Sequence, residues 1–579
     1  MTQSDSHLLA GGPSRPPASL FRRLTVLTVL VAGAVGGLYS WYAKSQPVSL
    51  PDVSGGRFAC VSYAPFREGQ SPFQPDIVIP PEQIAEDMEA LSQQTRCVRT
   101  YAVDQGLEMV PQIAQQFGLR VLLGAWIGSQ PDKNKLQLDK AIELANAHPG
   151  TVRAIVVGNE VLLRGELPAD RLIETIRYVK ARTEIPVTYA DVWEFWMRNK
   201  QIAAEVNFAT IHILPYWEDD PIAIQYAVPH VMDIYRHVQE EMPNVTLLIG
   251  ETGWPSAGRQ REGAAPGRVN QAAFMRYFVS AASQAGVDYN LIEAFDQPWK
   301  RYNEGTVGGN WGLYDVKRQP KFSLTGPVVE LPDWQIYLGI SVLLGLFPLG
   351  WTLLRRRSRG EKLANAPLGW ATLTAAGLTG GTLLTLFGRY LLESSRSLVE
   401  WGAGGAIWLL LFFAAISLSG ALARAVAGAG TDGPAALERI RRHVAGEFDL
   451  TGRAHALGLF RLLALAIALA VSLGLVFDGR YRDFPASAAM LPAMGFLLLA
   501  FLDRKAAEMG DEEIVLSILL AIFSVAIVVQ AHLANIQAMA WVGATLLLAL
   551  PVLTGQRLRM PDTETADSTP ASVIAAPAD

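Results

Sequence analysis

The chain has 579 residues, of which 50% are hydrophobic and 18% charged, and its formal net charge is −5. This length exceeds that of one ordinary domain, and the composition leans towards a membrane protein. The small negative charge argues against a nucleic-acid partner, because phosphate binding requires a concentrated basic face and the Lys/Arg clusters here border apolar segments.

The N-terminal region combines a polar segment with an apolar one. Residues 1–20 are rich in Ser, Pro and Gly, and we expect a disordered cytoplasmic N-terminus. Residues 21–45 contain two arginines followed by an apolar run that is long for a signal peptide and offers no clean cleavage site. This pattern predicts a transmembrane anchor.

The C-terminal half is a succession of apolar runs, each about as long as a bilayer core is thick. It predicts a membrane domain of about seven helices over 333–555, and the polar tail 556–579 is expected to be disordered and cytoplasmic. With the anchor, about eight spans are expected. The predicted C-terminal spans are 334–354, 367–388, 398–423, 456–477, 484–502, 513–532 and 536–553.

The distribution of positive charges predicts the orientation. Most arginines and lysines of the second half follow alternate spans, which places the N-terminus and the tail inside and residues 50–332 outside. Arg461 and His532 lie near span ends, where we expect their side chains to reach the membrane surface. Four arginines fall outside the pattern: Arg389, Arg396, Arg480 and Arg482.

Residues 50–332 alternate short apolar runs with helical patterns. Eight βα units in this length predict an α/β fold of the (β/α)8 TIM-barrel type, followed by the all-α transmembrane domain. A doubly wound open sheet would require a Gly-rich turn after its first strand, and Tyr63-Ala64-Pro65-Phe66 is no such turn. The predicted strands are 58–64, 97–101, 120–126, 152–159, 186–191, 207–213, 246–251 and 288–295, and the clearest helical patterns are 81–93, 133–147, 168–183 and 270–285.

The chain has two cysteines, Cys60 and Cys97, on the first and second predicted strands. Adjacent strands bring them close enough for a disulfide, which suits an oxidising compartment. Two buried free thiols are an equally good interpretation.

Two glutamates end apolar strands that face each other across the predicted barrel mouth. The fourth strand ends in Gly158-Asn159-Glu160, and the seventh in Gly250-Glu251-Thr252-Gly253. Glycoside cleavage requires such a pair, because one carboxyl group protonates the leaving oxygen while the other attacks the anomeric carbon or activates water. A lone glutamate at a strand end is more often a solvated loop residue, but two on rigid facing strands favour a catalytic pair.

These motifs, with Gly250-Glu251-Thr252-Gly253-Trp254-Pro255 and Ala294-Phe295-Asp296-Gln297-Pro298-Trp299-Lys300, resemble glycoside hydrolase family 17, the β-1,3-glucanases and β-1,3-glucanosyltransferases. The resemblance covers 55–325 and implies a retaining mechanism, with Glu160 as general acid/base and Glu251 as nucleophile. The family often has an acid at the position of Gln297, so no catalytic role is assigned there. Aromatic walls and a neighbouring anion predict a raised pKa for Glu160.

The other strand ends supply expected sugar contacts, because sugar rings stack on aromatic side chains while polar groups bind their hydroxyls. Asn159 is expected to bind the 2-hydroxyl. Tyr216, Trp254 and Trp299 are the strongest aromatic candidates, and Trp193, Trp196, Trp217 and Trp299 the candidates for acceptor subsites. The full set of predicted substrate contacts is Tyr63, Tyr101, Trp126, Asn159, Asp191, Trp193, Tyr216, Trp254, Trp299 and Lys300.

His212 is interpreted as a satisfied core histidine, and the spacing of His, Cys and acidic residues predicts neither a metal site nor a cofactor. The leading hypothesis is a β-1,3-glucan transglycosylase in a bacterial inner membrane, multi-pass, with its catalytic domain in the periplasm. The expected partners are a β-glucan, the lipid bilayer and a glucan synthase or exporter. The alternatives are an endo- or exo-β-1,3-glucanase and a non-catalytic glucan-binding subunit of a synthase or exporter.

Overall fold

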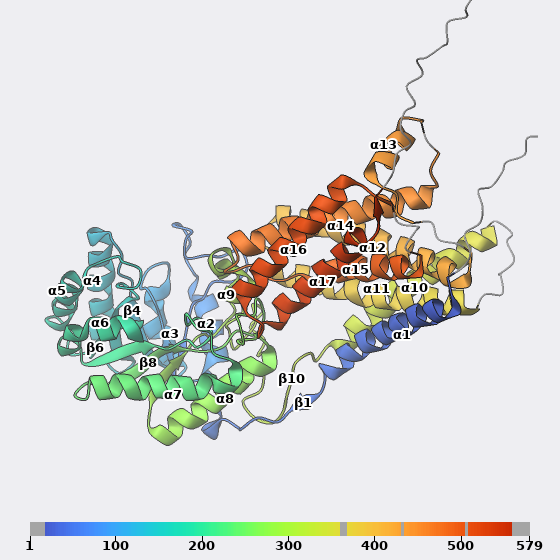
Figure 1. Ribbon diagram of the computed structural model, residues 1–579. Coiled ribbons are helices and arrows are strands. Elements are labelled where there is room, and N and C mark those ends of the chain that lie inside the picture. The colour runs from blue at the N-terminus through green and yellow to red at the C-terminus, as the bar shows by residue number, and fades with distance from the viewer. Residues whose placement is uncertain (1–17, 359–366, 430–432, 448, 504–507, 558–579) are drawn as a thin grey trace, which may run out of the picture.

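The computed structural model describes residues 18–358, 367–429, 433–447, 449–503 and 508–557. It has two parts that lie side by side, a mixed α/β body and a long helical bundle (Figure 1). The expectations for residues 1–17 and 558–579 fall outside the described residues.

The α/β body is a closed barrel of eight parallel strands, so the predicted fold class is confirmed. The first strand is shorter than the apolar run that predicted it, and the others lie within a residue or two of the expected starts. In chain order the strands are β2 (Val61–Ser62), β3 (Cys97–Arg99), β4 (Arg120–Ala125), β5 (Val152–Asn159), β6 (Val187–Val192), β7 (Phe208–His212), β8 (Leu247–Thr252) and β9 (Asp288–Leu291).

Helices follow the strands and cover the outside of the barrel, as expected for repeated βα units. Pro81 and Pro131 stand at the first positions of α2 and α4, where a missing N–H costs nothing, and Gly286 ends α8 with a φ of 67°. The helices are α2 (Pro81–Ser92), α3 (Val110–Gln116), α4 (Pro131–Ala147), α5 (Ala169–Lys180), α6 (Trp193–Arg198), α7 (Ile224–Glu241), α8 (Arg268–Ala285) and α9 (Arg301–Gly308).

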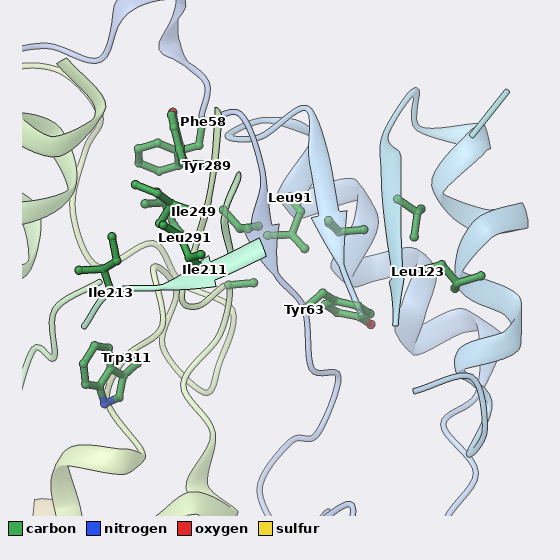
Figure 2. Close-up of a cluster of buried hydrophobic side chains, with 14 of the residues drawn as sticks. Phe58, Tyr63, Leu91, Leu123, Ile211, Ile213, Ile249, Tyr289, Leu291 and Trp311 are labelled. Atoms are coloured by element: carbon green, nitrogen blue, oxygen red, sulfur yellow. The ribbon is translucent and has the colours of Figure 1, made fainter. Parts of the chain in front are cut away.

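Aliphatic and aromatic side chains fill the barrel core. Ile211, Ile249 and Leu291, from the consecutive strands β7, β8 and β9, are fully buried and lie together (Figure 2). Cys60 and Cys97 form a disulfide between the first two strands, which decides between the two alternatives left open by the sequence.

The bundle consists of α1 and the helices from α10 onward. Among the described residues, seven helices are long and apolar enough to cross a membrane. The remaining predicted span, 484–502, corresponds to α15, which has 17 residues and stands at the short end of the spanning range. The helices are α1 (Leu20–Ala43), α10 (Trp334–Ser358), α11 (Pro367–Ser394), α12 (Leu398–Ala427), α13 (Leu437–Val444), α14 (Gly452–Phe477), α15 (Ala486–Leu502), α16 (Asp511–Ala531) and α17 (Ile536–Leu553).

In the part of the chain that the structure describes, two short strand pairs lie outside the barrel. The segments that enter and leave the barrel pair as antiparallel β1 (Pro47–Val48) and β10 (Val328–Val329). The parallel pair β11 (Glu508–Met509) and β12 (Gln556–Arg557) lies in the bundle.

The expectation that Arg461 reaches the membrane surface is wrong. The Arg461 side chain is 1% exposed and binds Glu513 through two hydrogen bonds, of 2.8 Å from Nε and 2.7 Å from Nη2. A buried charge without a partner is costly, so separating Arg461 from Glu513 would be unfavourable. The ion pair therefore holds α14 against α16. The His532 side chain is 60% exposed, and its Nδ1 lies 3.6 Å from Glu262 Oε2 of the barrel.

The barrel rests on the bundle through the loops that follow β8 and β9. Asn535 Nδ2 donates to the Gln260 carbonyl at 2.8 Å, and Gln260 N donates to Gln537 Oε1 at 2.8 Å. Arg396 Nη1 donates to the Arg301 carbonyl at 2.9 Å. These loops leave the C-terminal ends of the strands, so the face that carries active sites in TIM barrels is the one that meets the bundle.

Candidate active site

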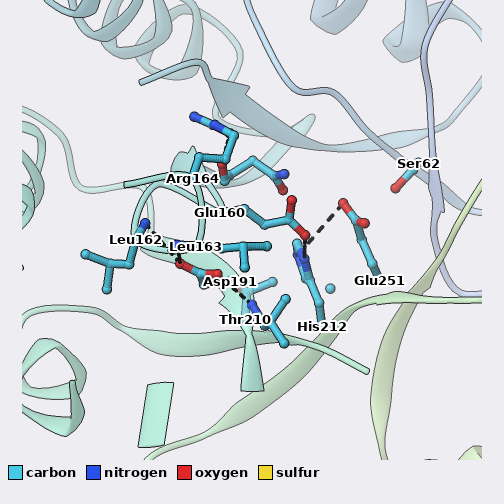
Figure 3. A network of polar contacts seen from close by, with 12 residues as sticks. Ser62, Glu160, Leu162, Leu163, Arg164, Asp191, Thr210, His212 and Glu251 are labelled. Carbon is cyan, nitrogen blue, oxygen red and sulfur yellow. Dashed lines mark hydrogen bonds and ion pairs between the residues drawn. The ribbon is translucent and has the colours of Figure 1, made fainter. Parts of the chain in front are cut away.

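Glu160 and Glu251 lie close together at the C-terminal ends of β5 and β8. A carboxylate oxygen of each and a ring nitrogen of His212 all lie within 4.8 Å of one another. Figure 3 shows His212 between the two glutamates. β5 and β8 are the fourth and seventh strands of the barrel, whose convergence was predicted. They bring two carboxyl groups within a few ångströms of each other, so that both can act on one bond.

A tight backbone turn at the end of β5 positions Glu160. Glu160 has a φ of 53°, and its N–H donates to the Ala190 carbonyl of β6 at 2.8 Å. Gly158 has a φ of 83°, and a Cβ there would lie 2.5 Å from Val161 Cγ2. Only glycine fits at that position, so the motif is explained by the turn that presents the glutamate.

Arg99 and Tyr101 hold the Glu251 carboxylate. Its Oε1 accepts from Arg99 Nη1 at 3.0 Å and from the Tyr101 hydroxyl at 2.8 Å. The same guanidinium donates to the Gly250 carbonyl at 2.9 Å and to Asn159 Oδ1. The Arg99 side chain is 1% exposed, so its charge acts in a site with little water to screen it.

His212 is fully buried and hydrogen-bonded, as expected for a satisfied core histidine, but its partners include the two glutamates, so it also belongs to the site. Its Nδ1 lies 3.1 Å from Glu160 Oε1, and its Nε2 lies 3.8 Å from Glu251 Oε1. Arg99 Nη1 is 3.4 Å from Nε2, and because arginine only donates, this contact favours a tautomer in which Nδ1 carries the proton and donates to Glu160. The oxygens of Glu160 and Glu251 and the ring nitrogen of His212 lie close enough to hold a metal ion, but the positive charge of Arg99 beside them disfavours one.

The environment lowers the pKa of Glu160, whereas the sequence predicted a raised pKa. Burial pushes the pKa upward, but the hydrogen bond from His212 and the positive charges of Arg99 and Arg164 outweigh it. The prediction failed because it counted the aromatic walls and the neighbouring anion and did not include a histidine or an arginine beside Glu160.

Comparisons with known proteins show to which family the barrel belongs. Residues 60–312 match the BtgE/BtgC glycoside hydrolase domain. A glucan 1,3-beta-glucosidase of Arthroderma benhamiae is 31% identical over 269 residues, which cover 43% of this chain and 85% of the relative. The chain belongs to glycoside hydrolase family 17.

Other relatives match over the same part of the chain. A glucan 1,3-beta-glucosidase of Schizosaccharomyces pombe is 31% identical, covering 41% of this chain and 79% of that protein. The crystal structure of a glycoside hydrolase family 17 beta-1,3-glucanosyltransferase from Rhizomucor miehei matches with 26% identity and a TM-score of 0.41, covering 46% of this chain and 98% of that one.

The structure reassigns Asp191 from the predicted sugar contacts to the support of the family 17 site. Its buried carboxylate accepts from the N–H groups of Leu162 and Leu163, at 3.2 and 3.4 Å, and from the Tyr189 hydroxyl. These contacts fasten the segment that follows Glu160 (Figure 3). Asp191 is therefore a positioning residue.

Three predicted aromatic contacts are packing residues of the family 17 barrel. Tyr63 is 1% exposed, and Tyr216 and Trp254 are fully buried. Their polar atoms are satisfied internally: Tyr63 binds Asp87, and Tyr216 and Trp254 donate to backbone carbonyls. Trp196, an expected acceptor residue, is 1% exposed and is buried in the same way.

Several other predicted contacts are at least partly exposed. Trp126 is 41% exposed, with the Arg164 guanidinium 4.1 Å from its ring centre. Asn159 Oδ1 accepts a hydrogen bond from Arg99, which leaves the NH2 group of Asn159 as the donor for a ligand. Trp299 and Trp193 are partly buried, and Trp299 contacts the exposed Phe73 edge to face.

Lys300, a predicted sugar contact, forms a largely buried ion pair with Glu293. Its Nζ lies 2.9 Å from both oxygens of Glu293, which is 1% exposed. Burial raises the pKa of Glu293 to about 7, although the Lys300 charge opposes the rise. Glu293 and Arg99 were both missed by the sequence reasoning, yet an arginine within the apolar run 97–101 was a signal that could have been used.

Replacing His212 tests the electrostatic description of the site. The hydrogen bond from His212 favours the ionised form of Glu160, so His212→Phe should raise the pKa of Glu160 and move the alkaline limb of the kcat/KM profile to higher pH. The measurement is turnover of laminari-oligosaccharides against pH. His148→Phe, at the C-terminal end of α4 and on the opposite side of the barrel, is the matched control and should leave the profile unchanged. An unshifted or lowered limb in His212→Phe would contradict the description.

Proposed function

We propose that this protein is a retaining enzyme that cleaves β-1,3-glucan chains and mainly transfers the cleaved segment to another sugar. The observation that carries the proposal is the pair Glu160 and Glu251, whose oxygens approach within 4.8 Å. Retaining glycosidases have carboxyl groups about 5–5.5 Å apart, whereas inverting enzymes leave about 6.5–9.5 Å for a water. A subunit that only binds glucan would have no use for two carboxylates held this close.

The proposed first step uses Glu251 as nucleophile and Glu160 as acid. Glu251 attacks the anomeric carbon, the bond to the leaving oxygen breaks, and Glu160 gives that oxygen its proton. Arg99 and Tyr101 fix the attacking carboxylate, so little reorientation is needed at the moment of reaction. The product is a glycosyl ester on Glu251.

In the second step Glu160 acts as base. Ester formation removes the negative charge of Glu251, which favours the ionised form of Glu160 further. Glu160 takes the proton of the incoming hydroxyl, the hydroxyl oxygen bonds to the anomeric carbon, and the Glu251 carboxylate leaves. The His212 hydrogen bond stabilises Glu160 in the form that this step requires.

Transfer requires that a sugar hydroxyl compete with water for the ester. Binding in line with the base provides the advantage, since effective molarities of well-oriented groups reach about 10⁵ M or more. Trp217 is partly buried, stacks on Trp311 and contacts Tyr481 of the bundle edge to face. Trp217 offers aromatic surface where the barrel meets the bundle, and Trp299 offers a second aromatic surface beside Phe73, so we propose acceptor subsites at these two residues.

Product size distinguishes transfer from hydrolysis. With a laminari-oligosaccharide donor at rising acceptor concentration, we expect products longer than the donor and few new reducing ends. The measurement is chromatographic sizing of products of the purified full chain. Glu251→Gln is the inactive control. Accumulation of glucose and short oligosaccharides at high acceptor concentration would contradict transfer and support the endo- or exo-glucanase alternative.

We further propose that the chain is a multi-pass protein of a bacterial inner membrane, with the barrel in the periplasm beside a glucan synthase or exporter. The barrel contacts Arg396, Tyr481 and Asn535, which belong to three different loops of the bundle. The positive-inside pattern assigns all three loops to the outer side. Arg396 and Arg482, exceptions to that pattern, lie in these contacts.

Cysteine labelling tests this orientation. The two native cysteines form a disulfide, so an introduced cysteine is the only free thiol. Leu398, at the start of α12, is 91% exposed, and Val444, in α13, is 75% exposed. A membrane-impermeant maleimide applied to intact spheroplasts should label Leu398→Cys and spare Val444→Cys until the membrane is broken. The reverse pattern would contradict a periplasmic barrel.

A further inference from the structure

A cavity of about 650 Å³ lies where the bundle meets the barrel. Its walls come from helices α11, α12, α14, α15 and α17, and the barrel helix α9 contributes Tyr302, Gly305 and Thr306. Pockets that bind small molecules typically measure about 300–1,000 Å³, so the cavity is large enough for a ligand.

The cavity has two chemically different ends. The part between the spans is lined by apolar residues such as Leu410, Ala414 and Ile467, from the middle of α12 and α14. The end towards the barrel is polar. Its residues include Tyr302, Ser394, Ser395, Arg396, Glu400, Asp478, Arg482 and Asp483. An occupant that satisfies both ends has an apolar chain and a polar head.

Asp483 indicates what kind of head the cavity accepts. Its Oδ2 accepts from the Thr306 hydroxyl, while its Oδ1 is buried and has no hydrogen-bond partner among the described residues. Burial raises the pKa of Asp483 to about 6, and the Thr306 hydrogen bond opposes the rise. A buried acceptor without a partner is costly, and a ligand hydroxyl would supply the missing donor.

The charges at the polar end disfavour an anionic head. Arg396 binds Glu400 at 2.6 Å, and Arg482 binds Asp478 at 2.8 Å, so each guanidinium already has a carboxylate partner. Asp483 adds a further carboxyl group. A phosphate would meet more acidic than basic groups, whereas a neutral sugar can donate its hydroxyls to them.

We propose that this cavity is a glycolipid-binding site, in which an acyl chain occupies the apolar end and a sugar head binds at Asp483 beside α9. Helix α9 also borders the candidate active site: burial raises the pKa of Glu304, and the charges of Glu160 and Glu251 raise it further. A sugar held in the cavity therefore binds the same helix that carries a carboxylate within electrostatic range of the catalytic pair.

Competitive photolabelling of the full chain in phosphatidylcholine nanodiscs tests the proposal. The probe is a glucosyl diacylglycerol with a diazirine on one acyl chain, and mass spectrometry locates the label. We expect labelled peptides from α12 and α14, and competition by unlabelled glucosyl diacylglycerol at least tenfold stronger than by diacylglycerol or phosphatidylglycerol. Equal competition by diacylglycerol, or stronger competition by phosphatidylglycerol, would overturn the proposal without any variant.

Two variants locate the two ends of the ligand. Ala468→Trp fills the apolar end and should reduce labelling at least tenfold, whereas Val525→Trp, on a 66% exposed position of α16, is the matched control and should not. Asp483→Ala should abolish the preference for the glucosyl lipid. Equal labelling of the two Trp variants would contradict the site. Glu251→Gln should still bind the probe, so a failure of the lipid-binding proposal can be distinguished from a failure of the proposed catalytic function.

Discussion

The candidate site depends on one buried positive charge. Two carboxylates held within 4.8 Å of a histidine nitrogen and of each other repel, and their removal from water adds a further cost. The positive charge of Arg99 offsets both the repulsion and the cost of burial. Arg99 binds the Glu251 carboxylate, the Gly250 carbonyl and the side-chain oxygen of Asn159. In this way a residue of β3 connects the ends of β5 and β8, the two strands on which the proposed chemistry depends.

The barrel and the glutamate pair could be predicted from the sequence because they follow local rules. Apolar runs at regular spacing predict parallel strands, and a glycine before each glutamate reflects a close approach of the chain. At Gly158 that approach is visible, since a side chain would collide with Val161. Both signals lie within a few residues of the group that they place.

The environment of the glutamates could not be predicted because it comes from distant strands. His212 and Arg99 are far from Glu160 in the sequence, and only the closed barrel shows that they meet. The predicted rise in the pKa of Glu160 was therefore wrong, because these groups lower it. The prediction that Tyr216 and Trp254 contact the sugar was wrong for a related reason. Both residues follow strand ends, but the helices and loops that cover them decide whether they are buried in the core or exposed to a ligand. Arg461 was misjudged in the same way, since its partner Glu513 lies on another helix.

The central claim is that Glu251 becomes covalently bound to the sugar. Its most direct test is to incubate the full chain with a 2-deoxy-2-fluoro laminaribioside that carries a good leaving group, and to map the modified peptide by mass spectrometry. The fluorine slows both steps and the leaving group restores the first, so the glycosyl ester accumulates. We expect one added glycosyl group on Glu251 and its release when an acceptor sugar is supplied. Modification of Glu160 or Glu293, or steady turnover with no trapped ester, would contradict it.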